Sequence, residues 1–261
     1  MGERVILTLD VEEFDVPLEY GQALAPDTQL AVGREGLASV LDLLAEFDIR
    51  TTCFTTANFA LHSPAQMQRL AQGHEIASHG YWHSQFDVAD LAQSRHVLRE
   101  LSGQEVLGFR MARMAAVEHA AIAQAGYLYN SSDNPIWLPG RYNHFRQPRL
   151  LYWSGPLLNI PVTASPVLRV PLFWLAVKNF PWWFLKLTSR RTLGHDGIIN
   201  LYFHPWEFAE LGAYRLPWII RRRHGAAMRE RLRRYLGWLQ QRATFITMGE
   251  YAQELRARRR I

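Results

Sequence analysis

The chain has 261 residues, 48% of them hydrophobic, a formal net charge of +5 and a single cysteine. This length fits one α/β barrel, which commonly has about 250 residues, and the hydrophobic content is sufficient for a buried core. The lone Cys53 excludes an internal disulfide, and no run approaches the roughly 20 apolar residues of a membrane-spanning helix.

The positive charge comes almost entirely from arginine and is concentrated late in the chain, at residues 221–223, 229–234 and 256–260. Such runs can indicate nucleic-acid binding. However, apolar residues between Gly225 and Gln241 recur at helical spacing, which places the arginines on the solvated side of a helix. No nucleic-acid motif accompanies them, so we expect no nucleic-acid partner. Solubility is the commonest explanation, and anionic lipid or an acidic sugar is a better partner than DNA.

The first predicted strand is the apolar run at residues 5–9, and acidic residues begin where it ends. Side chains alternate along an extended chain, so Asp10 and Glu12 face one way and Glu13 the other. This alternation favours Glu12 over Glu13 as the carboxylate that binds a ligand in a site shared with Asp10. The alternative for the whole acidic cluster is that it forms a solvated strand end or a helix cap.

Strands and helices alternate through the following residues, which favours a mostly parallel sheet. Further strands are predicted at residues 50–56 and 73–78, and helices at residues 36–44, 88–101 and 115–125. Gly103 and Gly126 are plausible helix stops. Cys53 falls inside a strand and is interpreted as a buried, inert thiol. No repeat or linker divides residues 1–261, so we expect a single domain.

Histidines follow two more strand ends. His79 and His83 come after the strand at residues 73–78, and His204 follows the apolar strand at residues 197–203. Polar clusters at the carboxyl ends of parallel strands are typical of an α/β-barrel active site. Two histidines with a carboxylate match the ligands of a catalytic zinc that keeps one position open for water. A His-x-x-x-His pair can equally be two ordinary histidines.

Four motifs in order resemble those of the polysaccharide deacetylases, the carbohydrate esterase class that includes the NodB-type chitooligosaccharide deacetylases. They are Thr-Leu-Asp-Val-Glu at residues 8–12, Ser-His through His at 78–83, Gly-Phe-Arg at 108–110 and Tyr-Phe-His at 202–204. The resemblance covers most of the chain and implies a distorted (β/α) barrel. The Asp-Val-Glu opening and the Phe-His-Pro-Trp-Glu ending look closest to the branch found with bacterial surface-polysaccharide synthesis, such as that of lipopolysaccharide O-antigen.

The resemblance also implies roles for individual residues. It implies that Asp10 is the base, that Arg110 orients this base and that His204 is the acid. It also implies that Glu12, His79 and His83 bind the metal. Zinc is the expected metal, although nickel, cobalt and iron also accept imidazole. Aromatic residues next to the motifs are expected to contact the substrate, and these are Tyr81, Trp82 and Trp206.

Two positions depart from the family pattern. Ala112 stands where a proline usually follows the motif arginine, and Asn130 takes the place of the aspartate that orients the late histidine. An asparagine cannot stabilise imidazolium by charge, and Asp133 is the alternative source of that charge. These departures motivate an alternative, in which the chain is a non-catalytic carbohydrate-binding or assembly protein.

The expected reaction is hydrolysis of an N-acyl group, above all N-acetyl, on an amino sugar of a surface polysaccharide or its lipid-linked precursor. Deformylation of a lipid-linked amino sugar and opening of a cyclic amide are close variants. The predicted strand at residue 5 leaves no room for a secretory signal, so we expect a cytoplasmic protein, with attachment to the inner membrane as an option.

Residues 170–185 form an aromatic stretch interrupted by Pro171 and Pro181. Packing against the barrel wall is the favoured interpretation. Alternatives are a sugar platform or a docking surface at the membrane interface, since Trp is enriched there and Arg190 and Arg191 follow closely. Membrane docking would suit a sugar attached to a polyprenyl phosphate carrier.

Overall fold

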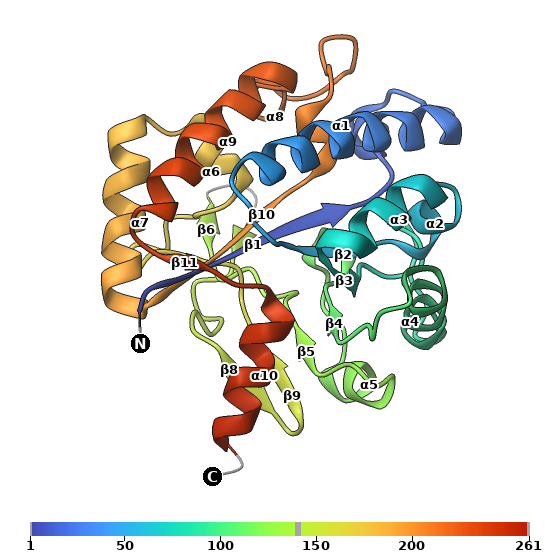
Figure 1. Ribbon diagram of the computed structural model, residues 1–261. Helices are drawn as coiled ribbons and strands as arrows, with labels where there is room; N and C mark the ends of the chain where they lie inside the picture. Colours follow the sequence, from blue (N-terminus) through green and yellow to red (C-terminus); the bar gives the residue numbers. More distant parts are fainter. Residues whose placement is uncertain (1, 139–141, 260–261) are drawn as a thin grey trace.

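The computed structural model describes residues 2–138 and 142–259 of the chain. Its centre is a curled sheet with the strand order β10-β1-β2-β3-β4-β5-β9-β8, and β11 also pairs with β1 (Figure 1). The strands of this sheet are β1 (Arg4–Val11), β2 (Thr52–Thr55), β3 (Glu75–Ser78), β4 (Gly108–Phe109), β5 (Tyr129–Asn130), β8 (Tyr152–Ser154), β9 (Leu157–Asn159), β10 (Ile198–Phe203) and β11 (Thr244–Phe245). A separate antiparallel pair joins β6 (Trp137–Leu138) and β7 (Tyr142–Asn143).

Helices cover the outside of the sheet (Figure 1). The longer ones are α1 (Pro26–Glu46), α3 (Pro64–Gly73), α4 (Ala89–Ser102), α7 (Trp182–Asp196), α9 (Gly225–Gln240) and α10 (Met248–Arg259). The shorter ones are α2 (Ala57–Leu61), α5 (His119–Gln124), α6 (Trp174–Asn179), α8 (Trp218–Arg221) and three 3₁₀ turns, η1 (Val16–Tyr20), η2 (Ala112–Met114) and η3 (Pro205–Phe208).

Strand β1 lies between β10 and β2, second in the strand order, and is buried from Val5 onward. It pairs in parallel with β10 on one side and with β2 on the other, with Leu9 opposite both Phe203 and Cys53. Burial on both faces explains why its sequence is almost continuously apolar. Cys53 is fully buried in β2, as predicted, and burial raises the pKa of its thiol, which keeps it inert.

The sheet curls without closing. All its pairings are parallel except β8 with β9, and within the described residues no pairing joins β8 to β10 at the two ends of the path. The predicted fold class, a distorted (β/α) barrel, is therefore confirmed. Because neighbouring strands are parallel, the loops after β1, β3, β4 and β10 all emerge at one end of the barrel.

Most predicted helices are present. Helix α9 buries the five apolar side chains that the spacing predicts, Met228, Leu232, Tyr235, Leu236 and Leu239. The predicted helix at residues 115–125 is wrong at its start, since α5 begins only at His119. Arg113 and Met114 have φ angles of 57° and 53°, in the left-handed region. The chain leaves that turn extended, with Ala115 at ψ 151°, so a helix cannot start there.

The aromatic stretch at residues 170–185 mainly packs inward, as the favoured interpretation predicts. Phe173, Trp174 and Val177 are buried, and Pro181 separates α6 from α7. Trp183 is the clear exception, with 65% of its surface exposed. None of the helices in the described part of the chain is long and apolar enough to cross a membrane.

Helix α1 lies unusually close to two turns of the barrel. A Cβ atom at Gly36 would come within 1.8 Å of the Pro205 carbonyl oxygen in η3, and one at Gly33 would come within 2.9 Å of the Glu12 carbonyl oxygen. Both approaches are shorter than a carbon–oxygen contact allows. The two glycines therefore let α1 pack directly on the backbone that follows β1 and β10.

Candidate active site

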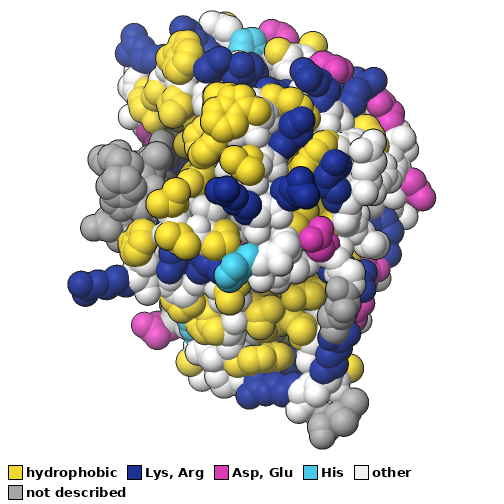
Figure 2. Space-filling view, turned by 90° about the vertical axis from the view of Figure 1, so that its left-hand side faces the viewer, with side chains coloured by type: hydrophobic (Ala, Val, Ile, Leu, Met, Phe, Trp, Pro, Cys, Tyr) yellow, Lys and Arg dark blue, Asp and Glu magenta, His cyan; other side chains and the backbone are white. Residues whose placement is uncertain are grey.

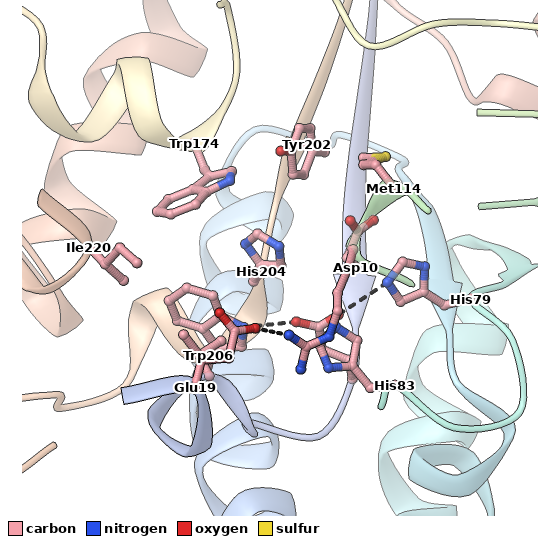
Figure 3. Close-up of a pocket in the computed structure, with 13 residues that line it drawn as sticks. Asp10, Glu19, His79, His83, Met114, Trp174, Tyr202, His204, Trp206 and Ile220 are labelled. Carbon is pink, nitrogen blue, oxygen red and sulfur yellow. Dashed lines mark hydrogen bonds and ion pairs between the residues drawn. The ribbon is translucent and has the colours of Figure 1, made fainter. Parts of the chain in front are cut away.

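A pocket of about 260 Å³ opens at the carboxyl end of the barrel (Figure 3). Its walls come from segments far apart in sequence: the loops after β1, β3, β4 and β10, together with α6 and α8. The residues that line it are Asp10, Glu12, Val16, Glu19, His79, His83, Arg113, Met114, Trp174, Tyr202, His204, Trp206 and Ile220. The neighbouring strand ends thus bring the acidic residues and the three histidines together in one pocket.

Glu12, His79 and His83 form a compact group, here called the metal triad. Glu12 Oε2 lies 3.1 Å from Nε2 of each histidine, and one ligand atom from each of the three residues lies within 4.8 Å of the others. All three side chains are buried. Glu13, in contrast, accepts hydrogen bonds from Thr56 and Asn58 on the other side of the chain. The alternation along the strand therefore separates Glu12 from Glu13 as expected.

Outer partners orient both imidazoles of the metal triad. His79 Nδ1 donates to the Arg110 carbonyl oxygen at 2.9 Å, and His83 Nδ1 lies 2.8 Å from Asp15 Oδ1. Because a carbonyl oxygen only accepts, Nδ1 of His79 carries hydrogen and its Nε2 faces Glu12. Metal-binding histidines are characteristically held in this way by a carbonyl or carboxylate on the second nitrogen. The residues present therefore fit a divalent metal.

The electrostatics of the metal triad are those of a strong charge pair. Burial alone would raise the pKa of Glu12, but His83, His79 and His204 outweigh it and lower that pKa well below its usual range. Burial alone would lower the pKa of His83, but Glu12 and Asp15 raise it to about 9. A proton on His83 thus balances the carboxylate, and a cation at the same place would replace that proton.

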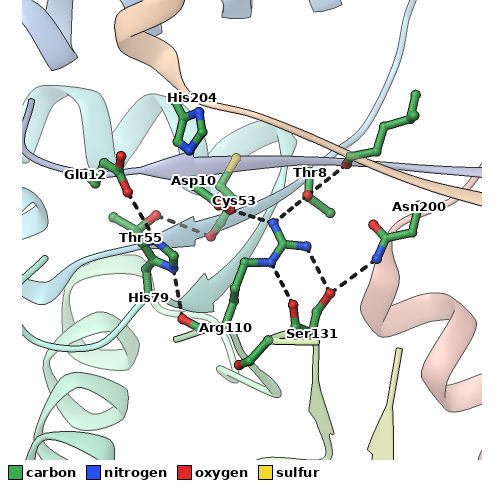
Figure 4. Close-up of polar contacts among 12 residues, drawn as sticks. Thr8, Asp10, Glu12, Cys53, Thr55, His79, Arg110, Ser131, Asn200 and His204 are labelled. Carbon is green, nitrogen blue, oxygen red and sulfur yellow. Dashed lines mark hydrogen bonds and ion pairs between the residues drawn. The ribbon is translucent and has the colours of Figure 1, made fainter. Parts of the chain in front are cut away.

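Asp10 pairs with Arg110 beside the metal triad (Figure 4). Arg110 Nη1 donates to Asp10 Oδ1 at 2.5 Å and to Thr8 Oγ1 at 2.8 Å. Its Nε and Nη2 donate to the carbonyl and hydroxyl oxygens of Ser131 at 3.1 and 3.0 Å. The guanidinium also lies 4.1 Å from the ring centroid of Phe54. Arg110 is fully buried, so its position and that of the Asp10 carboxylate are fixed together.

His204 is held by Glu207, which the sequence interpretation missed. Glu207 Oε1 accepts from the His204 backbone N–H at 2.9 Å and lies 3.2 Å from His204 Nδ1. Burial alone would lower the pKa of His204, but Glu207 and Glu12 outweigh it and raise that pKa. The imidazole stacks on Trp206 with 4.7 Å between ring centroids and meets Trp174 edge-on. The imidazole is therefore rigidly held, and its protonated form is stabilised.

The sequence comparison places the group that orients His204 at Asn130, and this prediction is wrong. Asn130 donates to Asn159 and accepts from Ser132, and Asp133 accepts from Tyr152. None of these hydrogen bonds involves His204. The relevant signal was the glutamate three residues after the histidine, since the 3₁₀ turn η3 folds that side chain back onto His204.

Lys178 adds a buried charge behind Glu207. Its Nζ lies 3.2 Å from Glu207 Oε2, and both side chains are fully buried. Nζ also donates to the Ile220 carbonyl oxygen at 2.9 Å and lies near the rings of Trp174 and Trp206. Burial lowers the pKa of Lys178, although Glu207 opposes that shift. The ion pair connects η3 to α6, and the hydrogen bond to Ile220 connects Lys178 to α8, so the position of Glu207 depends on both helices.

The three aromatic residues expected to contact substrate lie in different places. Trp206 lines the pocket, is 2% exposed, and donates from Nε1 to Glu12 Oε1 at 3.0 Å. It therefore orients a member of the metal triad. Tyr81 and Trp82 pack on each other, and neither lines this pocket; Trp82 is 41% exposed.

One wall of the pocket mouth was not predicted. Arg113 donates to Asp15 at 2.9 Å and also pairs with Glu19, so it joins the loop after β4 to the loop after β1. Ala112, the position that departs from the family proline, begins this turn. Asp15 is shared between Arg113 and His83, which links the mouth to the metal triad.

Comparisons with known proteins agree with this geometry. Residues 25–129 match the model of the polysaccharide deacetylase family. A solved structure of PuuE allantoinase superposes with a TM-score of 0.70 and 19% identity, covering 97% of this chain and 90% of that one. A probable polysaccharide deacetylase from Pseudomonas aeruginosa PAO1 gives 0.66 and 18%, covering 96% and 89%. A comparison with curated proteins finds no match.

The same fold also carries a protein without activity. A pseudoenzyme of carbohydrate esterase family 4 from Bacillus anthracis superposes with a TM-score of 0.54 and 11% identity, covering 96% of this chain and 66% of that one. The expected resemblance to the polysaccharide deacetylases is thus confirmed by the sequence match and by the fold. The fold alone therefore does not determine activity, which depends on the residues of the site.

Proposed function

We propose that this protein is a metal-dependent hydrolase that removes an acyl group, above all acetyl, from an amino sugar. The substrate we propose is a bacterial surface polysaccharide or its lipid-linked precursor, in line with the motifs at the two ends of the site. The observation that carries the proposal is one pocket that unites the metal triad, the Asp10–Arg110 pair and the His204–Glu207 pair. Those are the groups that amide hydrolysis needs.

Glu12, His79 and His83 would hold the metal, and zinc is the ion that we propose for these donors, with nickel, cobalt or iron as alternatives. When bound, such an ion polarises an amide carbonyl and makes water acidic enough to attack at neutral pH. The hydrogen bonds of His79, His83 and Glu12 to Arg110, Asp15 and Trp206 keep the three ligand atoms pointing toward one another.

Asp10 is the base in this proposal. Arg110 occupies Oδ1, so we assign Oδ2 to accept the proton of the attacking water. The buried guanidinium holds the Asp10 side chain in place, which leaves Oδ2 as the oxygen not engaged by Arg110 Nη1. His204 is the acid: Glu207 holds Nδ1, so Nε2 delivers a proton to the departing amine. An amide requires this proton because its free anion is a very poor leaving group.

The non-catalytic alternative is weaker than the sequence suggested. It rested on Asn130 and Ala112, but Glu207 supplies the carboxylate that Asn130 lacks, and Ala112 begins the turn that places Arg113 at the pocket mouth. The remaining support for a non-catalytic role is that a pseudoenzyme shares the fold. An activity assay separates the two functions.

Removal of the metal with a chelator should abolish amine release from N-acetylated amino sugars, and added zinc should restore it. The reason is that a chelator removes the ion held by the metal triad and leaves the side chains unchanged. His83→Ala should release no amine even with added zinc, and its bound metal, counted by elemental analysis, should be lost. The exposed His96 of α4 provides the matched control, since His96→Ala makes the same change away from the pocket. Chelator-insensitive release, or no release from any N-acyl sugar by metal-loaded protein, contradicts the proposal.

Glu207→Gln should shift the alkaline limb of the kcat/KM profile to lower pH. The Glu207 carboxylate raises the pKa of His204, and the acid form is lost as pH rises through that pKa, so removing the charge brings the loss forward. An adjacent opposite charge commonly changes a pKa by about 1–3 units, which sets the expected size of the shift. Asn130→Ala is the control and should leave this limb in place. A shift in Asn130→Ala but not in Glu207→Gln would restore the original assignment.

A further inference from the structure

We propose that the start of α7 and the short helix α8 form a docking surface for an anionic phospholipid membrane. Four exposed apolar side chains make its centre, namely Trp183, Leu187, Trp218 and Ile219, and are here called the docking patch. Their exposed fractions are 65%, 40%, 65% and 40%. The choice of a membrane as partner rests in part on the proposed lipid-linked substrate, but docking is measured without turnover, so it can fail independently of the proposed reaction.

The two halves of the docking patch are held next to the same short segment. Asn179 at the end of α6 donates to the Ile219 carbonyl oxygen at 3.0 Å, and Lys178 donates to the Ile220 carbonyl oxygen at 2.9 Å. After Asn179, the chain needs only Phe180 and Pro181 to start α7. Helix α8 is therefore fixed to the end of α6, and α7 begins at that end.

The aromatic residues of this region divide into two groups. Trp174 lines the pocket. Trp182 packs on Tyr235 with 6.2 Å between ring centroids and lies near Arg231 and Arg234. These side chains have a structural role. Trp183 and Trp218 instead present most of their surface to solvent. Two exposed tryptophans are unfavourable in water but well placed at a lipid headgroup boundary, where the indole ring is preferred.

The charge around the docking patch selects the partner. Residues 182–195 and 211–225, which contain all four patch residues, have no acidic side chain but include Lys186, Arg190, Arg191, Arg215, Arg221, Arg222 and Arg223. Arg222 lies 4.9 Å from the ring centroid of Trp218. Figure 2 shows the side of the molecule that α7 covers, where hydrophobic and basic side chains are interleaved over the upper half. Basic side chains around exposed aromatics match an anionic bilayer surface.

The docking patch also adjoins the pocket. Ile220, next to Ile219 on α8, lines the pocket, and so does Trp174 of α6 (Figure 3). A membrane that contacts Trp218 and Ile219 would therefore lie beside the pocket mouth. This location favours a membrane over a second protein, since a glycan carried by a lipid needs both surfaces at once.

The test is co-sedimentation of the full chain with phosphatidylcholine vesicles that contain phosphatidylglycerol, and with phosphatidylcholine vesicles alone. We expect binding to the anionic vesicles that weakens in high salt. The double variant Trp183→Ala/Trp218→Ala should lower the partition coefficient by about tenfold or more, because both rings lose their contact with lipid. Trp82→Ala, which also removes an exposed tryptophan, should bind like the unchanged protein.

Each opposite result overturns the proposal. The first is that the unchanged chain does not sediment with anionic vesicles. The second is that the double variant binds these vesicles as well as the unchanged chain. The third is that Trp82→Ala loses as much vesicle binding as the double variant. Sedimentation-velocity analysis without lipid adds one more: a dimer that Trp183→Ala/Trp218→Ala dissociates would assign the docking patch to a second copy of the chain. Because both tryptophans are exposed, the double variant should keep the thermal unfolding midpoint of the original protein.

Discussion

Asp10→Asn should reduce turnover by about 10²–10⁴-fold while the protein still binds one metal ion, because general-base catalysis contributes roughly that factor. The substitution removes the proton acceptor but keeps an oxygen that can accept from Arg110 Nη1. The metal triad does not include Asp10, so its ligands are unchanged. Turnover is measured by amine release, and metal content by elemental analysis of the same sample.

Glu13→Gln is the matched control for this variant. Glu13 is a carboxylate three residues after Asp10 that faces Thr56 and Asn58, so its loss should change turnover only a few-fold. Circular dichroism at the assay temperature shows whether either variant is unfolded. Loss of metal in Asp10→Asn would mean that the base and ligand roles of Asp10 and Glu12 are exchanged.

Arg110→Met should destabilise the protein by about 3–5 kcal/mol and also abolish amine release. Removing one partner of a buried ion pair leaves the other charge without compensation in a low-dielectric interior, and losses of about this size follow. Arg110 is fully buried and Asp10 is 2% exposed, so water cannot replace the missing guanidinium. The free energy of unfolding from urea titration measures the effect.

The exposed pair Arg50–Glu250 gives the comparison. Its side chains are 61% and 43% exposed, so Arg50→Met should cost about 1 kcal/mol or less. Equal losses in Arg50→Met and Arg110→Met would contradict the assignment of Arg110 as the buried counter-charge of Asp10. A stable but inactive Arg110→Met protein would limit the role of Arg110 to orienting the base.

The parts of the site that the sequence predicted are those fixed by strands. Asp10 lies near the end of β1 and Glu12 follows it, His79 and His83 follow β3, and His204 follows β10. Parallel pairing brings these strand ends together. The local period of two also separated Glu12 from Glu13. These inferences need only strand positions and one rule of sheet geometry, so they can be made without coordinates.

The parts that could not be predicted depend on turns. Asp15 contacts His83 because the chain bends after β1, and Glu207 contacts His204 because η3 is a 3₁₀ turn. Arg113 reaches Asp15 from a left-handed backbone conformation, which a non-glycine residue seldom adopts. Hydrophobic period does not encode these turns, and the one spacing signal among them is the glutamate three residues after His204. The division of the aromatic stretch into buried and exposed rings likewise depends on how α6, α7 and α8 pack.

Because of the close packing of α1, one helix positions both the metal triad and the turn that carries His204. Gly33 lies against the backbone of a metal-triad residue, and Gly36 lies against the turn that carries the acid and its carboxylate. The spacing between the proposed metal and the proposed proton donor is therefore set by a helix that contributes no side chain to either. Any side chain at residue 36 would displace η3 against α1, so mutational scans should find this position as intolerant as the histidines, although nothing about its own chemistry would explain why.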